Sequence, residues 1–219
     1  MLLDTVLTTD LADCGRHARE LADAGFAGAF TYEGQTDPFF PLVPAALEAD
    51  IDLYTNVAIA LPRSPMHLAY QAWDLQRASN GRFMLGLGSQ IKPHIERRYS
   101  ALWDKPVAQM RDLIRATKAI FEAWQNETPL HYEGPYYQHT LSIPPLTPKP
   151  LTHATAAKSG STAKVPPIWA GALGPMMTKM VAAEADGIII HPFNSAHFLR
   201  EHSRRLVTEA QAAAGRDLT

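Results

Sequence analysis

Short apolar runs alternate with longer amphipathic segments along the chain. The runs are nearly continuous, which is typical of strands buried on both faces of a parallel sheet. They cover residues 2–7, 26–32, 52–61, 83–88, 167–172 and 187–191. Between them, apolar positions three and four apart predict helices over 9–24, 40–49, 64–79, 104–125 and 195–214, with one more beginning near Gly174-Pro175. Six strand–helix units in sequence predict an α/β fold with a parallel sheet and right-handed crossovers.

The regular alternation favours a TIM-type (β/α) barrel over a doubly wound sheet. Such a barrel has eight strands, typically in about 250 residues, whereas the pattern here provides six. We therefore expect a single barrel domain over residues 1–219 that is incomplete, with about six β/α units. An open barrel exposes two edge strands, which a second copy of the chain, a strand from a partner or a longer polypeptide would cover.

Residues 128–166 interrupt the alternation. The first part, 130–141, predicts a hairpin around Glu133-Gly134. The second part, 142–167, is rich in Pro, Ser, Thr, Ala and Lys. It is far longer than an ordinary connection, which is typical of lids or poorly ordered segments. We therefore expect an inserted hairpin and lid at about 128–166.

The composition excludes several classes of function. The chain has 219 residues, 46% apolar and 19% charged, with a net charge of −2 and one cysteine. No basic run points to nucleic acid, no apolar run approaches the roughly 18 residues of a membrane helix, and no signal segment is visible. We expect a cytoplasmic protein without nucleic-acid or membrane partners. No pair among His131, His139, His153, His197 and His202 combines the spacing of a metal site with carboxylate or cysteine partners, so we expect no zinc or iron site. Cys14 lies on an apolar helix stripe, so we expect it in the core.

The run over residues 83–88 ends in glycines. Gly86 and Gly88 let the backbone approach a flat group or make a turn. The third glycine of a dinucleotide-binding GxGxxG motif is missing. A packed strand end and a cofactor site therefore both stay open for this segment.

Four segments resemble the bacterial luciferase-like monooxygenase superfamily. They are residues 31–39 (TYEGQTDPF), 55–58 (TNVA) with 63–65 (RSP), 79–88 (SNGRFMLGLG), and 168–175 (IWAGALGP) with 185–187 (ADG). The chain is most similar to the branch of coenzyme F420-dependent oxidoreductases, where residues 92–98 (KPHIERR) also look familiar. The resemblance covers essentially the whole chain. It implies a TIM barrel that binds a deazaflavin or flavin at the carboxyl ends of its strands.

The resemblance also implies which residues contact the cofactor ring. It implies a non-proline cis peptide bond after the third strand, at Asn56-Val57 within one residue, where the backbone bulges against the ring. It places Gly88 and Ser89 beside the ring edge, where a side chain on the glycine would clash. A tight turn is the alternative for these two residues.

Residues 171–174 precede a helix and form a candidate phosphate site. Free backbone N–H groups and the positive helix end attract an anion, and a bulky side chain would block its approach. The four residues are Gly171, Ala172, Leu173 and Gly174. No Lys or Arg lies within this turn, and a plain strand–helix connection is the alternative.

Two residues are candidates for proton transfer. The resemblance implies a histidine in the loop after the second strand, but this chain has Glu33 there. Glu33 would substitute as acid or base if burial favoured its protonated form; a structural carboxylate is the alternative. His191, at the end of the sixth strand, is the second candidate, with a structural histidine as the alternative. His94, Arg97 and Arg98 follow the fourth strand and would reach the same end of the barrel.

These expectations combine into one function with two alternatives. We expect an oxidoreductase that transfers hydride between coenzyme F420 and a small organic substrate, as a homodimer. An FMN-dependent monooxygenase that uses reduced flavin and oxygen shares the ring pocket and is the first alternative. The second is a shortened, non-catalytic chain that binds flavin or serves only as a structural dimer, because six strands stand where a barrel has eight.

Overall fold

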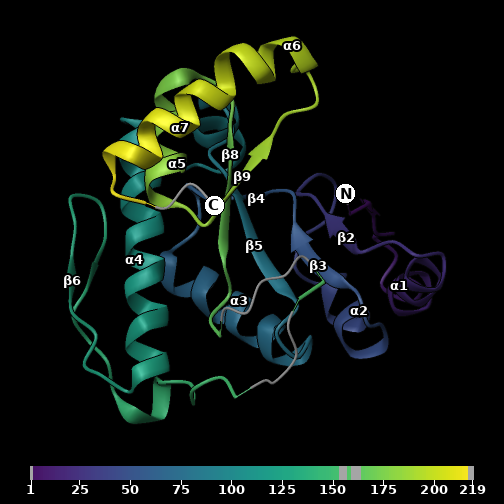
Figure 1. Cartoon of the computed structure of the whole chain (residues 1–219). Helices are drawn as coiled ribbons and strands as arrows, with labels where there is room; N and C mark the ends of the chain where they lie inside the picture. The colour runs from purple at the N-terminus through teal and green to yellow at the C-terminus, as the bar shows by residue number, and fades with distance from the viewer. Residues whose placement is uncertain (1, 153–156, 159–163, 217–219) are drawn as a thin grey trace.

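A parallel β-sheet with helices along its outer face forms the centre of the fold (Figure 1). The structure is a computed structural model that describes residues 2–152, 157–158 and 164–216. The sheet has the order β1-β2-β3-β5-β8-β9, and β4 pairs with the end of β5. Its strands are β1 (Asp4–Val6), β2 (Gly28–Thr31), β3 (Asp52–Thr55), β4 (Ala58–Ile59), β5 (Phe83–Gly88), β8 (Ile168–Ala172) and β9 (Gly187–Ile190). All six predicted strands are confirmed.

Helices connect the parallel strands. They are α1 (Cys14–Asp23), α2 (Leu42–Glu48), α3 (Pro65–Ala78), α4 (Pro106–Asn126), α5 (Pro175–Glu184), α6 (Ala196–Phe198) and α7 (Arg204–Ala213), with π-helical turns over His94–Arg98 and Leu199–Ser203. Ser64 caps α3, accepting a hydrogen bond from the Met66 N–H at 3.2 Å. None of the helices in the described ranges has both the length and the apolar character needed to cross a membrane.

The sheet curls like part of a barrel. Alternate residues of each strand point to the helices, and those between them point to the inner face. On the inner face, the Tyr54 ring of β3 lies 5.6 Å from the Trp169 ring of β8, although β5 separates these strands. A Cβ at Gly86 of β5 would lie 3.0 Å from the side chain of Ile189 on β9, across β8. Side chains meet across an intervening strand because the sheet is curved, so the expected incomplete (β/α) barrel is confirmed.

Several elements differ from their predicted extent, and the local cause is clear in two of them. The apolar run 52–61 is divided into β3 and β4 at the Asn56-Val57 peptide bond, which is cis, as the family resemblance implied. Helix α1 begins at Cys14 rather than near Asp10. The Asp10 carboxylate accepts from the Ala12 N–H (3.1 Å) and so holds a turn before the helix. Cys14 is buried, as expected.

The predicted hairpin is confirmed as β6 (Tyr132–Glu133) and β7 (Gln138–His139), and it lies beside α4 (Figure 1). Its anchor is the buried Asp112 of α4. The Asp112 carboxylate accepts from the Tyr132 hydroxyl (2.6 Å) and from the N–H groups of Tyr136 (2.8 Å) and Tyr137 (2.9 Å). Burial and the hydrogen bond to Asp112 raise the pKa of Tyr132, so this hydroxyl keeps its proton and donates.

The connection after the hairpin does not form the expected lid in its described part. It crosses the end of the barrel where the strands begin. The Lys158 N–H donates to Asp52, the first residue of β3 (2.7 Å), and the Trp73 indole of α3 donates to the Lys149 carbonyl (3.2 Å). Leu151 is buried there, so the connection covers apolar surface opposite to the end that a lid would close. Residues 153–156 and 159–163 of the expected lid lie outside the described residues.

Candidate functional site

The sequence-predicted site residues lie along one edge of the sheet, which we call the mouth. Strands of a parallel sheet all end at the same edge, and in (β/α) barrels this edge carries the active site. The mouth follows five strands in their spatial order: Glu33 after β2, Asn56 after β3, Gly88 at the end of β5, Ala172 at the end of β8 and His191 after β9. The fold therefore gathers these positions although they span most of the sequence.

Val57, Gly88 and Gly171 come together at the centre of the mouth. A Cβ at Gly88 would lie only 2.5 Å from Val57 Cγ2, whereas a Cβ at Gly171 would lie 3.8 Å from Val57 Cγ1 and 3.6 Å from the Leu87 carbonyl. A side chain at position 88 has no room because Val57 fills the space, with or without a cofactor. A methyl group at position 171 would make ordinary contacts. Gly88 is thus explained by packing, whereas a small side chain has room at Gly171.

Gly86 has a separate structural reason. A Cβ there would lie 1.7 Å from the main-chain oxygen of Thr55. The Thr55 hydroxyl donates to the Gly86 carbonyl (2.6 Å) and accepts from the Gly86 N–H (3.0 Å). Glycine lets the two backbones approach this closely. Beyond it, the Ser89 hydroxyl donates to the Gln90 carbonyl (3.3 Å). The segment is a packed strand end, and contact of Gly88 and Ser89 with a ring stays a prediction.

Glu33 lies in a network of hydrogen bonds at the mouth. Its side chain is only 7% exposed. One carboxylate oxygen accepts from the Ile59 N–H (2.8 Å) and from Nη1 of Arg63 (2.7 Å), and the other accepts from the Tyr99 hydroxyl (2.8 Å). Nη2 of Arg63 also donates to Asp37 (3.0 Å). Burial and the hydrogen bond to Glu33 raise the pKa of Tyr99, so the hydroxyl stays protonated and donates. Sequence reasoning did not find these partners.

The turn at residues 171–174 leads into α5 as expected. Gly174 is the N-cap of α5, it provides no capping side chain, and Pro175 follows at the first helical position. The next N–H groups, of Met176 and Met177, belong to the first turn of the helix and receive no cap from the side chain of the N-cap residue. Leu173 is 62% exposed, and a Cβ at Gly174 would meet no atom of the described residues within 4 Å. This turn is open to an anion at the helix end.

A cavity of about 160 Å³ borders the same turn and brings in a basic residue that sequence reasoning missed. Ala172 and Leu173 line it together with Asn194, Ser203 and Arg204. Arg204 begins α7, which packs beside α5 (Figure 1). Consecutive helices of a (β/α) barrel lie side by side. Because the helices after β8 and β9 are expected to be neighbours, the sequence could have predicted that Arg204 lies near this turn, although the turn itself contains no Lys or Arg.

His191 stands exposed at the end of the mouth formed by β9. Its Nδ1 accepts from the Phe193 N–H (3.3 Å), and its ring lies 4.3 Å from the Phe193 ring. Because Nδ1 accepts, the neutral ring carries its proton on Nε2. Four inter-strand spacings separate β2 from β9, about 19 Å along the sheet at about 4.8 Å each. The hydrogen bonds of the two side chains also go to other groups, Phe193 for His191 and Ile59, Arg63 and Tyr99 for Glu33, so these bonds do not join His191 and Glu33 as an acid–base pair.

Of the basic residues after β5, Arg98 connects two loops of the mouth. Arg98 donates to the Gly34 carbonyl (2.7 Å) and stacks over the Tyr99 ring at 5.2 Å. This guanidinium thus joins the loop after β5 to the loop after β2. Arg97 is exposed. Within the described residues, the buried Nδ1 of His94 has no hydrogen-bond partner.

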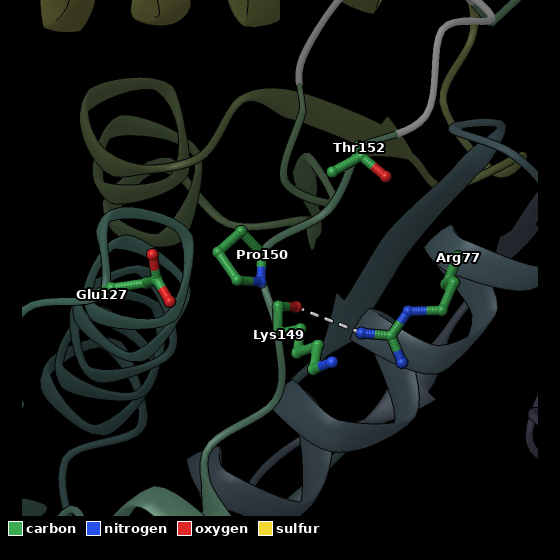
Figure 2. A pocket seen from close by; sticks show the side chains of 5 residues that line it. All are labelled: Arg77, Glu127, Lys149, Pro150 and Thr152. Atoms are coloured by element: carbon green, nitrogen blue, oxygen red, sulfur yellow. Dashed lines mark hydrogen bonds between the residues drawn. The ribbon is translucent and has the colours of Figure 1, made fainter.

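A cleft of about 560 Å³ lies at the other end of the barrel (Figure 2). Arg77, at the end of α3, donates to the Lys149 carbonyl (3.2 Å), and Glu127, just after α4, lines the same cleft. Pro150 and Thr152 complete the lining. None of the predicted site residues is among them, so the size of a cleft does not identify the site here.

Comparison with known sequences places the chain among related proteins. A family model described as luciferase-like monooxygenase matches residues 3–219. "Uncharacterized protein Rv1360" of Mycobacterium tuberculosis is 40% identical over 216 residues, which cover 98% of this chain and 61% of that protein. "Putative coenzyme F420-dependent oxidoreductase Rv3520c" of the same organism is 31% identical over 172 residues, which cover 75% of this chain and 47% of that protein. The chain thus spans about three fifths, 61%, of the length of Rv1360.

Solved structures share the fold. An F420-dependent secondary alcohol dehydrogenase in complex with an F420–acetone adduct matches with a TM-score of 0.76 at 13% identity, covering 99% of this chain and 66% of that chain. The oxygenating constituent of 3,6-diketocamphane monooxygenase from Pseudomonas putida, in complex with FMN, matches with a TM-score of 0.72 at 14% identity, covering 100% of this chain and 65% of that chain. At these identities the likeness shows a common architecture and leaves the chemistry to the site.

Proposed function

Because the chain belongs to the luciferase-like monooxygenase family, we propose that it is an oxidoreductase that binds coenzyme F420 at the mouth and transfers hydride to or from a small organic substrate. The name of Rv3520c and the F420 complex of the alcohol dehydrogenase support F420 as the cofactor. The meeting of Val57, Gly88 and Gly171 at the mouth carries the proposal, because it provides a wall without bulky side chains at the edge where (β/α) barrels bind ligands.

The residues at the mouth fit a flat cofactor that carries a phosphate. Gly171 and Gly174 leave free the space that a Cβ would fill. Val57 and Gly171 would face the ring, with Asn56, Gly88 and Ser89 at its edge. The N–H groups at the start of α5 would hold the phosphate, next to the positive charge of Arg204. When bound, F420 supplies the ring carbon that accepts or releases hydride.

His191 is our proposed acid or base. Hydride transfer to a carbonyl group leaves an oxygen that needs a proton, and the reverse reaction needs a group that takes one. The Nε2 of His191 carries the proton of the neutral ring, since Nδ1 accepts from Phe193. His191 follows Ile190, which pairs with Ala172, so it stands next to the strand that leads into the proposed phosphate site.

An FMN-dependent monooxygenase is the second candidate function. The solved structure from Pseudomonas putida is in complex with FMN, and its fold matches 100% of this chain. FMN also combines a flat ring with a phosphate, so the same residues would hold it. In this case the mouth would have to bind reduced flavin and admit oxygen.

Titration of the purified chain with F420 and with FMN tests the proposal. We expect saturable binding of F420, seen by absorption and fluorescence, and weaker binding of FMN. The variant Gly171→Ala should fold and melt as wild type because its methyl group has room, yet bind at least about tenfold more weakly because the methyl group displaces the ring. Tighter binding of FMN would favour the monooxygenase. Binding of neither cofactor would refute both enzymes in favour of the structural role.

A further inference from the structure

We infer that Glu33 is a positioning residue that holds the cofactor-facing wall of the mouth, with Arg63 and Tyr99 holding its carboxylate in turn. This inference rests on the proposed function, since it names what keeps the proposed cofactor site in shape. It assigns Glu33 a role different from the proton transfer that the sequence suggested.

Glu33 binds the main chain on both sides of Ala58. Its N–H donates to the Val57 carbonyl (3.2 Å), and its carboxylate accepts from the Ile59 N–H (2.8 Å). The side chain of Val57 in turn reaches the positions of Gly88 and Gly171. A shift of Glu33 would therefore displace the residue whose side chain contributes the centre of the wall.

The carboxylate of Glu33 is itself fixed from two other loops. Arg63, in the loop after β4, donates to it (2.7 Å) and also to the Ile59 carbonyl (3.0 Å) and Asp37 (3.0 Å). Tyr99, in the segment after β5, donates to its other oxygen (2.8 Å). The side chains of Glu33 and Arg63 are 7% and 17% exposed, so water does not readily replace either partner. Three loops of the mouth thus depend on one carboxylate.

The hydrogen bonds match a charged carboxylate that only accepts. Ile59 N–H, the Arg63 guanidinium and the Tyr99 hydroxyl are all donors. The oxygen that faces Ile59 and Arg63 meets two groups that can only donate, so a proton on that oxygen would have no acceptor there. A proton donor also needs an oxygen directed to the substrate, whereas both oxygens of Glu33 are engaged within the protein. The geometry favours positioning over proton delivery.

Two variants and their combination test the inference. Glu33→Gln keeps the size of the side chain and removes its charge, and Arg63→Lys keeps the charge but cannot reach three acceptors at once. We expect each variant to bind F420 or FMN about tenfold more weakly, the equivalent of one lost charge-assisted hydrogen bond, and to shift the absorption spectrum of the bound cofactor. In the double variant the losses should not add, since both changes break the same network.

Glu184→Gln is the matched control. Glu184 accepts from Arg115 at 2.6 Å, and its side chain is 17% exposed, but it lies at the end of α5 away from the mouth. This variant should lower thermal stability and leave cofactor affinity and the bound spectrum unchanged. The comparison separates positioning of the wall from a general loss of stability.

The outcomes distinguish the inference from the proposed function. If wild type binds neither cofactor, the proposed function fails and the inference falls with it. If wild type binds but Glu33→Gln and Arg63→Lys bind equally well with the same spectrum, only the inference is overturned. Full affinity in Glu33→Gln with loss of turnover and of one limb of the pH profile would also overturn it, in favour of proton transfer. If Glu33→Gln does not fold, the affinity and bound spectrum of Arg63→Lys test the inference, and wild-type values in that variant overturn it.

Discussion

Replacement of Gly88 by alanine tests the packing at the mouth. The new methyl carbon would lie 2.5 Å from Val57 Cγ2 and 3.4 Å from Val57 Cβ. Two carbon atoms make favourable contact at about 3.5–4.0 Å, so the closer contact is short by about 1 Å. Valine is stiff at χ1, and the carbonyl of Val57 accepts from the Glu33 N–H. The collision must therefore force Val57 from its rotamer or move the main chain of the mouth.

Overpacking of this kind costs about 1–3 kcal/mol. For a chain of 219 residues, each kcal/mol lowers the melting temperature by roughly 2–4 °C. We therefore expect Gly88→Ala to melt about 2–12 °C below wild type. The double variant Gly88→Ala/Val57→Ala removes the atoms that collide and should melt close to Val57→Ala alone.

Thermal unfolding followed by circular dichroism measures this cycle with four proteins: wild type, the two single variants and the double variant. Equal melting temperatures of Gly88→Ala and wild type would show that Val57 does not exclude a side chain at position 88, as would a double variant that shows the sum of both losses. The result also bears on cofactor binding. A loss of affinity in a Gly88 variant does not by itself prove contact with the ring, because the variant disturbs Val57 first.

Three further changes have expected results. Gly86→Ala should lower the free energy of unfolding, measured by chemical denaturation, by about 3 kcal/mol or more, because its methyl group would lie 1.7 Å from the main-chain oxygen of Thr55. A stability equal to that of wild type would contradict the close packing of these two strands. Asp112→Ala should lower the free energy of unfolding by about 1–3 kcal/mol and make residues 130–141 sensitive to limited proteolysis, because the hairpin loses the acceptor of three hydrogen bonds. A hairpin that is not cleaved would contradict the role of Asp112 as its anchor. Burial lowers the pKa of His139 below its ordinary 6.5, partly offset by Asp112. The unfolded chain therefore binds this proton more readily than the folded one, and the free energy of unfolding should fall as the pH drops below about 6.5. His139→Phe should flatten that decline, and an identical pH dependence in both proteins would count against it.

The sequence predicted the barrel well because buried parallel strands and amphipathic helices have distinct patterns. The continuous apolar runs marked every strand of the main sheet, and Ser64-Pro65 marked the start of α3. The cis peptide bond at Asn56-Val57 came from the family resemblance alone, and the division of the apolar run into β3 and β4 at this bond was not predicted, since no local pattern marks it. The place of the long connection was missed because its apolar residues, such as Leu151, do not show which end of the barrel they cover.

The sequence predicted that the candidate residues share one edge of the sheet but did not predict their contacts. The order of the strands was sufficient to bring Gly88 and His191 to one edge. The collision between Val57 and a side chain at position 88 depends on the pairing of Ile59 with Gly88, a register that the sequence does not specify. Glu33 was selected for the right loop, but its partner Tyr99 lies 66 positions away, and only the folded chain shows that its carboxylate is fully engaged.

Hydrogen–deuterium exchange of the purified chain, with and without F420 or FMN, locates the cofactor-binding site without a substitution. If the mouth binds the cofactor, we expect slower exchange in peptides covering residues 56–60, 86–90 and 171–177. The cleft lined by Arg77, Glu127 and Lys149 should exchange as before. Protection confined to that cleft, or no protection at the mouth at a saturating cofactor concentration, would contradict the account.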